Sequence, residues 1–183
     1  MKPVLLYGSV VAVALTSALC LSMAPAPFLP VPVHRGLHLV GMVLLMGNAL
    51  SGAVWLALAD ASRSLRRLQF SLAAINRLDV WITAPASMLL VVNGAALAGI
   101  HGGVFKPLWL QWGVGLFGAA GVLWGSLLVP MQLRLEHACR QVAGSDDVPP
   151  PSLRRPLVRY FVAGGTVGAL LLAALWVMVL RPV

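Results

Sequence analysis

Five apolar stretches, each about long enough to cross a bilayer, constrain this 183-residue chain more than any other feature. A spanning helix needs roughly 20 mostly apolar residues, because each residue adds ~1.5 Å and the hydrocarbon layer is ~30 Å thick. The stretches show no alternation of apolar and polar residues, which favours helices over a barrel. We expect an all-α, polytopic membrane helical bundle with five transmembrane helices, an anchor helix plus a four-helix bundle. The stretches are 3–22, 37–59, 78–100, 110–133 and 160–181.

The basic residues indicate how the chain is oriented. Its net charge is +8, yet the positive charges cluster between apolar stretches rather than spreading as a nucleic-acid footprint would. By the positive-inside rule, the side of the membrane that carries more lysine and arginine residues is cytoplasmic. We therefore predict a membrane protein with its amino terminus cytoplasmic and its carboxyl terminus on the outer side, in contact with the lipid bilayer and with no nucleic-acid partner. The richer side carries Lys2, Arg63, Arg66, Arg67, Arg77, Arg134, Arg140, Arg154, Arg155 and Arg159, and the other side Arg35, Lys106 and Arg181.

The segments between the stretches suggest two parts. Residues 1–33 are expected to be an anchor helix and a Pro-rich linker, since prolines at 25–32 favour extended backbone. The first apolar run exceeds the ~7–15 residues of a signal core, which favours an uncleaved anchor. Residues 34–183 are expected to form a four-helix membrane domain. Within it, the basic segment 60–77 is predicted to lie at the interface, and 137–156 is predicted to be a mobile loop.

Two small-residue motifs occur in the later stretches, Gly121-x3-Gly125 and Gly164-x3-Gly168. Such spacing lets helix backbones approach closely in lipid, where no hydrophobic force drives association. We interpret both motifs as packing sites inside the bundle.

The segment HRGLHLVGMVLLMGNAL, residues 34–50, holds two histidines four apart and then two methionines four apart. Residues four apart on a helix are offset by ~40°, so all four side chains cannot face one ion. His38 and Met42 together suit Cu(I). Haem b would need His38 with His101 or a methionine from another helix, or one open axial position. The alternative is an ordinary membrane helix with no cofactor, in which His34 lies at the interface.

Polar residues within the apolar stretches form two groups. The outer group includes Asn93, expected at the depth of Met42, and His101 and Gln111 near the rim of an outward-opening cavity. In the inner group, Asp79 is expected to cap the amino terminus of a helix and to contact Arg134. The residues assigned structural polar roles are Asn48, Asp79, Asn93, Gln132 and Arg134.

The sequence carries no Ser/His/Asp set, CxxC pair, P-loop or glycine-rich nucleotide motif. Catalytic residues therefore cannot be assigned, and whether the chain is an enzyme stays open. The function we favour is a small membrane protein that binds haem b or copper through His38 in redox or metal handling. The alternative is a non-catalytic accessory or assembly subunit, packed against a membrane protein partner in a larger complex.

Several short patterns together resemble the uncharacterised bacterial integral-membrane family known as domain of unknown function 2269. They are His38 with Gly47-Asn48-Ala49 and Trp55, Asn76-x2-Asp79-x3-Thr83-x-Pro85, Trp124-x5-Pro130-x-Gln132, and Met178-Val179-x-Arg181-Pro182. More distantly, the chain looks like HemJ-type protoporphyrinogen oxidases, which are associated with haem b, and CopD-type copper-resistance proteins. That likeness implies ligation by His38. The basic partner that the oxidases carry in a later helix has no clear counterpart here.

Overall fold

The computed structural model describes residues 3–23, 25–142 and 147–181, and within these ranges the chain is helical with no strand. Five helical segments are long and apolar enough to span a membrane, which confirms the predicted fold class. Lys2 and Pro182 lie outside the described residues. In chain order, the elements are α1 Pro3–Met23, α2 Val31–Ala61, α3 Leu65–Leu78, the π turn η1 Asp79–Thr83, α4 Ala84–Ile100, α5 Leu108–Leu123, the π turn η2 Trp124–Leu128, α6 Val129–Gln141, the 3-10 turn η3 Pro151–Leu153 and α7 Arg154–Leu180.

Proline explains the two π turns, which lie inside continuous spans. Pro85 and Pro130 each stand at the start of the α-helix that follows a π turn. A proline ring lacks an amide hydrogen and clashes with the carbonyl four residues earlier, here those of Trp81 and Ser126. Widening the preceding turn relieves that clash without ending the helix. The helix from Leu65 to Ile100 therefore runs for 36 residues without a break.

Several predicted boundaries were wrong because the helices are longer than the apolar runs. Helix α2 begins at Val31, since a proline such as Pro32 fits the first turn of a helix, so the linker ends before residue 34. Helix α3 is not a separate interfacial segment, because it continues into α4. Consequently Asp79 lies within a span and caps no helix. Both ends of the loop predicted for 137–156 belong to helices, residues 137–141 to α6 and 154–156 to α7, and residues 143–146 lie outside the described residues.

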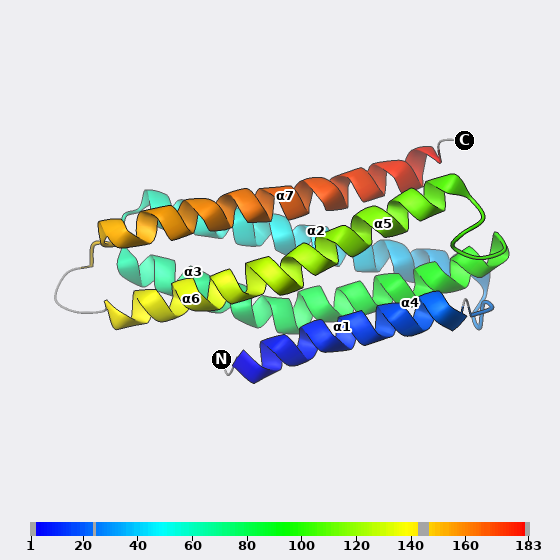
Figure 1. Cartoon of the computed structure of the whole chain (residues 1–183), viewed down its shortest axis with the longest axis horizontal. Helices are drawn as coiled ribbons and strands as arrows, with labels where there is room; N and C mark the ends of the chain where they lie inside the picture. The colour runs from blue at the N-terminus through cyan, green and yellow to red at the C-terminus, as the bar shows by residue number, and fades with distance from the viewer. Residues whose placement is uncertain (1–2, 24, 143–146, 182–183) are drawn as a thin grey trace.

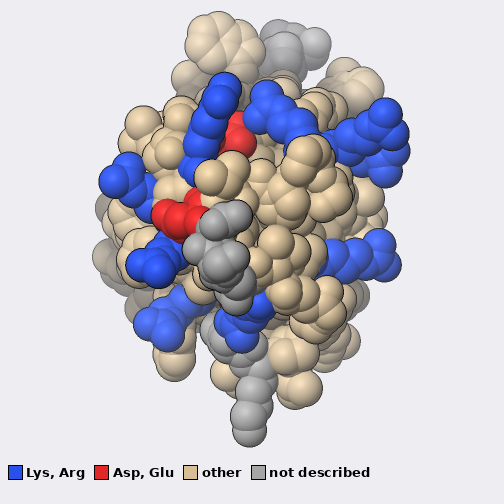
Figure 2. Space-filling view, turned by 90° about the vertical axis from the view of Figure 1, so that its left-hand side faces the viewer, with Lys and Arg blue, Asp and Glu red and all other residues tan. Residues whose placement is uncertain are grey.

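The long helices lie side by side along one axis (Figure 1). Helix α2 packs against α4, α5 packs against α7, and α1 lies along α4. Helices α3 and α6 pack against each other at one end of the bundle. Lysine and arginine side chains gather on that end, as Figure 2 shows. We call it the basic end, made by the turn at 62–64, the last turn of α6 and the first turn of α7, and we call the opposite end, with loops 25–30 and 101–107, the far end.

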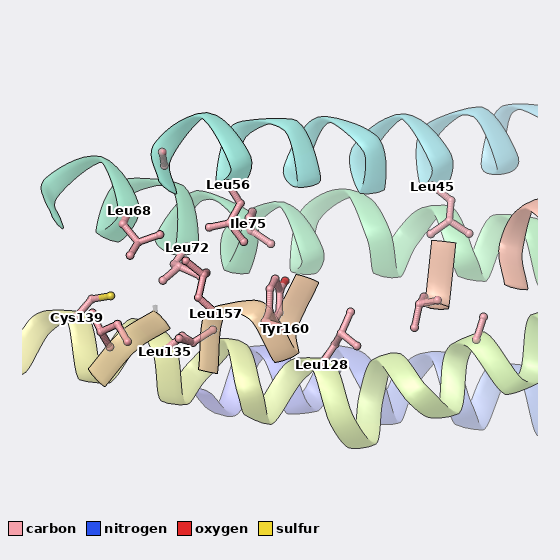
Figure 3. Packing of buried hydrophobic residues seen from close by; sticks show 14 of the residues in the cluster. Leu45, Leu56, Leu68, Leu72, Ile75, Leu128, Leu135, Cys139, Leu157 and Tyr160 are labelled. Atoms are coloured by element: carbon pink, nitrogen blue, oxygen red, sulfur yellow. The ribbon is translucent and has the colours of Figure 1, made fainter. Parts of the chain in front are cut away.

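The apolar core is concentrated toward the basic end (Figure 3). Leu68 and Leu72 of α3 are almost completely buried, with exposed fractions of 1% and 0%, and they face Leu135 of α6 and Leu157 of α7. Leu65, Leu68 and Leu72 recur at helical spacing, and this spacing serves packing between helices. Between membrane helices such leucines stabilise the fold through close van der Waals packing.

Polar contacts close the basic end on its solvent side. Ser64 caps α3, and its hydroxyl also donates to the Asp147 carboxylate at 2.8 Å. The same carboxylate accepts from the backbone N–H of Arg66 at 2.9 Å, and these two donors lower the pKa of Asp147. Arg154 of α7 forms an ion pair with Asp60 of α2 at 2.9 Å. The start of α7 and residue 147 are therefore fastened to the α2–α3 corner.

Candidate ligand cavity

A cavity of about 1370 Å³ lies between α1, α2, α4, α5 and α7. It is larger than the roughly 300–1,000 Å³ pockets that hold drug-sized ligands. Most of its wall is apolar. Polar residues line it at two levels, His38 with Arg35, His101 and Arg181 toward the far end, and Asp79 with Asn48, Thr83, Gln132 and Tyr160 toward the basic end.

Glycines form much of the wall on α5 and α7. A Cβ atom added at Gly118, Gly121, Gly165 or Gly168 would meet no heavy atom within 4 Å. The predicted packing role of the two small-residue motifs was therefore wrong at Gly121 and Gly168. The nearest contacts of the other two motif glycines are side chains, Val10 for Gly125 and Leu128 for Gly164. The motifs keep the cavity wall flat instead of joining helix backbones.

His38 is held on the cavity wall by α4. Its Nδ1 atom lies 2.8 Å from the backbone carbonyl oxygen of Leu90. A carbonyl oxygen can only accept, so Nδ1 donates the hydrogen, and the lone pair of a neutral ring is on Nε2. A Cβ atom added at Gly94 would lie 2.8 Å from Cε1 and 3.9 Å from Nε2, so the Nε2 corner is turned away from α4. His38 therefore has a fixed tautomer with Nε2 available.

His34 has a different environment from the one predicted. It is completely buried rather than interfacial. Its Nδ1 lies 2.8 Å from Asn93 Oδ1, and its Nε2 accepts the backbone N–H of Leu29 at 3.1 Å. The ring also meets Phe28 edge-on, with 4.5 Å between ring centroids. Both nitrogens are occupied, so His34 fastens the 25–30 loop to α4 and cannot serve as a ligand.

Asn93 consequently lies at the level of His34, two helical turns from the predicted level of Met42. The reason is that α2 begins at Val31, six residues before the predicted start at 37, so its residues pair with different residues of α4 than predicted. At the level of Met42, the α2 backbone approaches α4 closely, and a Cβ atom at Gly41 would lie 2.9 Å from the backbone oxygen of Ala86.

Two other predicted ligands, Met42 and His101, also line the cavity. Met42 is part of its wall. His101 lies at the rim, where its ring meets Trp109 edge-on at 5.6 Å and the Arg181 guanidinium lies 5.3 Å from the centre of the Trp109 ring. Gln111 is exposed and donates to the backbone oxygen of Phe105, outside the cavity. Across ranges 3–23, 25–142 and 147–181, no three His, Cys, Asp or Glu residues converge as metal ligands do.

A hydrogen-bonded network forms the inner floor of the cavity. Asn48 of α2 donates to Thr83 Oγ1 at 2.8 Å, and the Thr83 hydroxyl donates to Asp79 Oδ1 at 2.9 Å. Gln132 Nε2 donates to Asp79 Oδ2 at 3.0 Å and to Asn76 Oδ1 at 2.6 Å. Asp79 is 6% exposed and receives a donor on each carboxylate oxygen. These contacts bring Asn48, Asp79 and Gln132 into one network, and their structural polar roles stay a prediction.

The network continues behind the floor. The Tyr160 hydroxyl donates to Gln132 Oε1 at 2.9 Å. Asn76 Nδ2 donates to Glu136, whose carboxylate also forms an ion pair with Arg140. The predicted contact between Asp79 and Arg134 is wrong, because Arg134 is exposed and forms no ion pair with a described residue.

Sequence reasoning assigned no role to Glu136, Asn76 or Tyr160. Glu136 lies just beyond the apolar stretch that ends at residue 133, and its spacing of four residues from Gln132 places both side chains on one helix face. Likewise Asn76, Asp79 and Thr83 recur at helical spacing along one span. Those spacings were the available signal. Tyr160 of α7 offered none, because only the tertiary structure brings it to Gln132.

The chain matches a family model described as "Predicted integral membrane protein (DUF2269)" over residues 32–182. No curated protein and no solved structure matches it. The likeness to HemJ-type and CopD-type proteins stays a prediction.

Proposed function

We propose that this chain, which belongs to the DUF2269 family of predicted integral membrane proteins, binds haem b in its cavity through His38. The supporting observation is the hydrogen bond from His38 Nδ1 to the Leu90 carbonyl. Ligating histidines commonly donate their second ring nitrogen to a backbone carbonyl or carboxylate, which fixes the tautomer and makes the free nitrogen a better ligand. When bound, haem would supply one-electron chemistry.

The cavity walls fit a planar macrocycle. The glycine-lined faces of α5 and α7 leave open space where side chains would otherwise project. Arg35 and Arg181 line the same cavity toward the far end, where guanidinium groups suit the carboxylates of a haem. His101, which lines the same cavity from the end of α4, would be the candidate for a second protein ligand to the haem iron, because Met42 lies on the same helix as His38.

Copper has less support than haem. A single imidazole in a broad apolar cavity matches one axial ligand, whereas a copper site needs several donors that converge on one ion. Within the part of the chain that the structure describes, no three His, Cys, Asp or Glu residues do so. His38 and Met42 remain the pair to test for Cu(I).

The absorption spectrum of the full chain, purified from haem-replete and copper-replete cells, tests this proposal. We expect a Soret band and, after reduction, α and β bands. His38→Ala should lose or shift these bands because the iron loses its axial imidazole. His137→Ala is the matched control, since that residue is exposed on α6. Added imidazole should restore part of the spectrum to His38→Ala.

Two other outcomes would replace the proposal of haem binding with a different function. Copper that co-purifies with wild-type protein and is lost in His38→Ala or Met42→Ala would replace haem with a copper site. Protein that carries neither cofactor but co-purifies with another membrane protein would favour the accessory-subunit alternative.

The orientation that we propose places the basic end in the cytoplasm of a bacterial inner membrane, in accordance with the positive-inside rule. Reporter fusions at residues 62 and 183 test it. The first should be active only as a cytoplasmic reporter and the second only as a periplasmic one. The reverse pattern would overturn this orientation.

A further inference from the structure

We infer that the inner floor of the cavity is a binding site for a monovalent cation, with Asp79 as its charged ligand. This inference goes beyond the proposed function, because neither haem nor His38 takes part in it. It rests on two observations about the floor network, its charge and its remaining hydrogen-bonding capacity.

The charge of the network is unbalanced. Glu136 is neutralised by Arg140, and it lies behind the floor rather than on the cavity wall. Asp79 is on the wall, and no Lys, Arg or His among the described residues forms an ion pair with it. Its oxygens meet neutral donors, the Thr83 hydroxyl, the Gln132 amide and the indole N–H of Trp124. A carboxylate buried without a counter-charge is costly, and the cost is relieved either by a proton or by a cation that reaches the carboxylate from the cavity.

The floor residues can accept further hydrogen bonds from the cavity, but they have almost no hydrogens left to donate. Both hydrogens of the Gln132 amide are used, on Asn76 and Asp79. The Thr83 hydroxyl hydrogen is used on Asp79, and the Tyr160 hydroxyl hydrogen is used on Gln132. Apart from one N–H of Asn48, these floor residues therefore present oxygen lone pairs to the cavity. The oxygens belong to Asp79, Asn48, Thr83, Gln132 and Tyr160.

Carboxylate and neutral oxygens are the groups that bind hard cations and ammonium groups. They offer little to an anion, which would need donors. Such a cation has two sources, a free alkali ion such as Na⁺, or the ammonium head of an apolar amine whose body lies in the rest of the cavity. Both use the same chemistry at Asp79.

A proton wire is a weaker explanation of the network. The links from Asp79 to Glu136 pass through the side-chain amides of Gln132 and Asn76. An amide donates and accepts hydrogen bonds, but it has no exchangeable acidic proton near neutral pH to pass along a chain. The network therefore holds Asp79 in place instead of connecting it to the basic end.

Thermal unfolding of the purified full chain in detergent tests the site. Na⁺, K⁺ or hexylammonium chloride is added, and choline chloride at equal ionic strength is the reference. A ligand of the folded state at a hundredfold excess over its Kd should raise the Tm of wild-type protein by about 5–10 °C. Asp79→Asn keeps the shape of the side chain and removes its charge, so its Tm should not respond. Asp60→Asn removes an equal charge from the basic end and should respond like wild type.

The pattern of responses identifies the source of the cation. A response to Na⁺ or K⁺ indicates a free ion, and a response to hexylammonium alone indicates the head of an amine. If Asp79→Asn does not fold, Asn48→Leu supplies the second variant, and it should weaken the response at least tenfold in concentration. An unchanged Tm of wild-type protein in all three salts, or an equal response in Asp79→Asn, would overturn the inference. Haem-free protein that responds to Na⁺ would support this site while contradicting the proposed function.

Discussion

The half of the bundle near the basic end and the half near the far end differ in what fills the space between their helices. Toward the basic end, α3 and α6 complete a packed core of leucines backed by the Asp79 network. Toward the far end, the α2–α4 pair and the α5–α7 pair face each other across the cavity. The same five spans thus build a packed base and an open chamber.

Side-chain volume accounts for this difference. The helices of the basic half present leucines to one another, such as Leu72, Leu135 and Leu157. The far half presents glycines such as Gly118 and Gly168, which leave space where a larger side chain would have met the facing helix. An apolar chamber that stays empty loses van der Waals contacts on every wall.

The largest expected difference between the halves is in the cost of removing a leucine. Leu72→Ala leaves a new cavity in a close-packed region and should lower the free energy of unfolding by about 2–5 kcal/mol. Leu97→Ala only enlarges an existing cavity and should cost less than about 1 kcal/mol. Denaturant unfolding in detergent measures both. Equal costs would contradict the distinction between a packed half and an open half.

A smaller difference is expected for single hydrogen bonds. Tyr160→Phe leaves the buried Gln132 oxygen without its donor and should cost about 1–3 kcal/mol. Gln111→Ala removes an exposed bond near the far end, where water replaces the lost partner, and should change stability by less than about 0.5 kcal/mol. The same unfolding measurement compares them. A larger loss in Gln111→Ala than in Tyr160→Phe would reverse the predicted ranking.

The smallest effect concerns pH at the solvent face of the basic end. The pKa of Asp147 is lowered in the folded state by the Arg66 N–H and the Ser64 hydroxyl, so its contribution is present above the unfolded-state pKa of about 3.9. It is lost as pH falls through the lower folded-state value. Wild type should be slightly more stable than Asp147→Asn at neutral pH, and this gap should close in acid. A gap that widens in acid would contradict the capping role of Asp147.

Sequence periodicity predicted the number and type of the spans because bilayer thickness and backbone hydrogen bonding leave few alternatives. It placed the ends poorly, since helices such as α6 continue past the apolar run into polar sequence. For that reason sequence reasoning gave Glu136 no role. It also supplied the wrong partner for Asp79, because a charge pair with Arg134 was the simplest explanation of two polar residues at one depth.

The candidate site was only partly predictable for a related reason. His38 was identified from its residue type and its position in a span, but the roles of His34 and His38 depend on their partners, Asn93 and Leu90. Those partners follow from the register of α2 against α4, which a single sequence does not determine. The glycine motifs had two possible meanings, close packing or open space, and only the tertiary structure distinguishes them.

The amount of haem bound per chain in a pair of glycine variants tests the central claim most directly. Gly94→Ala would place a Cβ atom 2.8 Å from the His38 ring and displace it from the Leu90 carbonyl, whereas a Cβ atom at Gly47 meets nothing within 4 Å. We predict that wild type and Gly47→Ala bind equal amounts of haem with the same spectrum, and that Gly94→Ala binds less or shows a shifted Soret band. Equal haem content and identical spectra in all three proteins would contradict ligation by His38, as would wild-type protein that binds no haem.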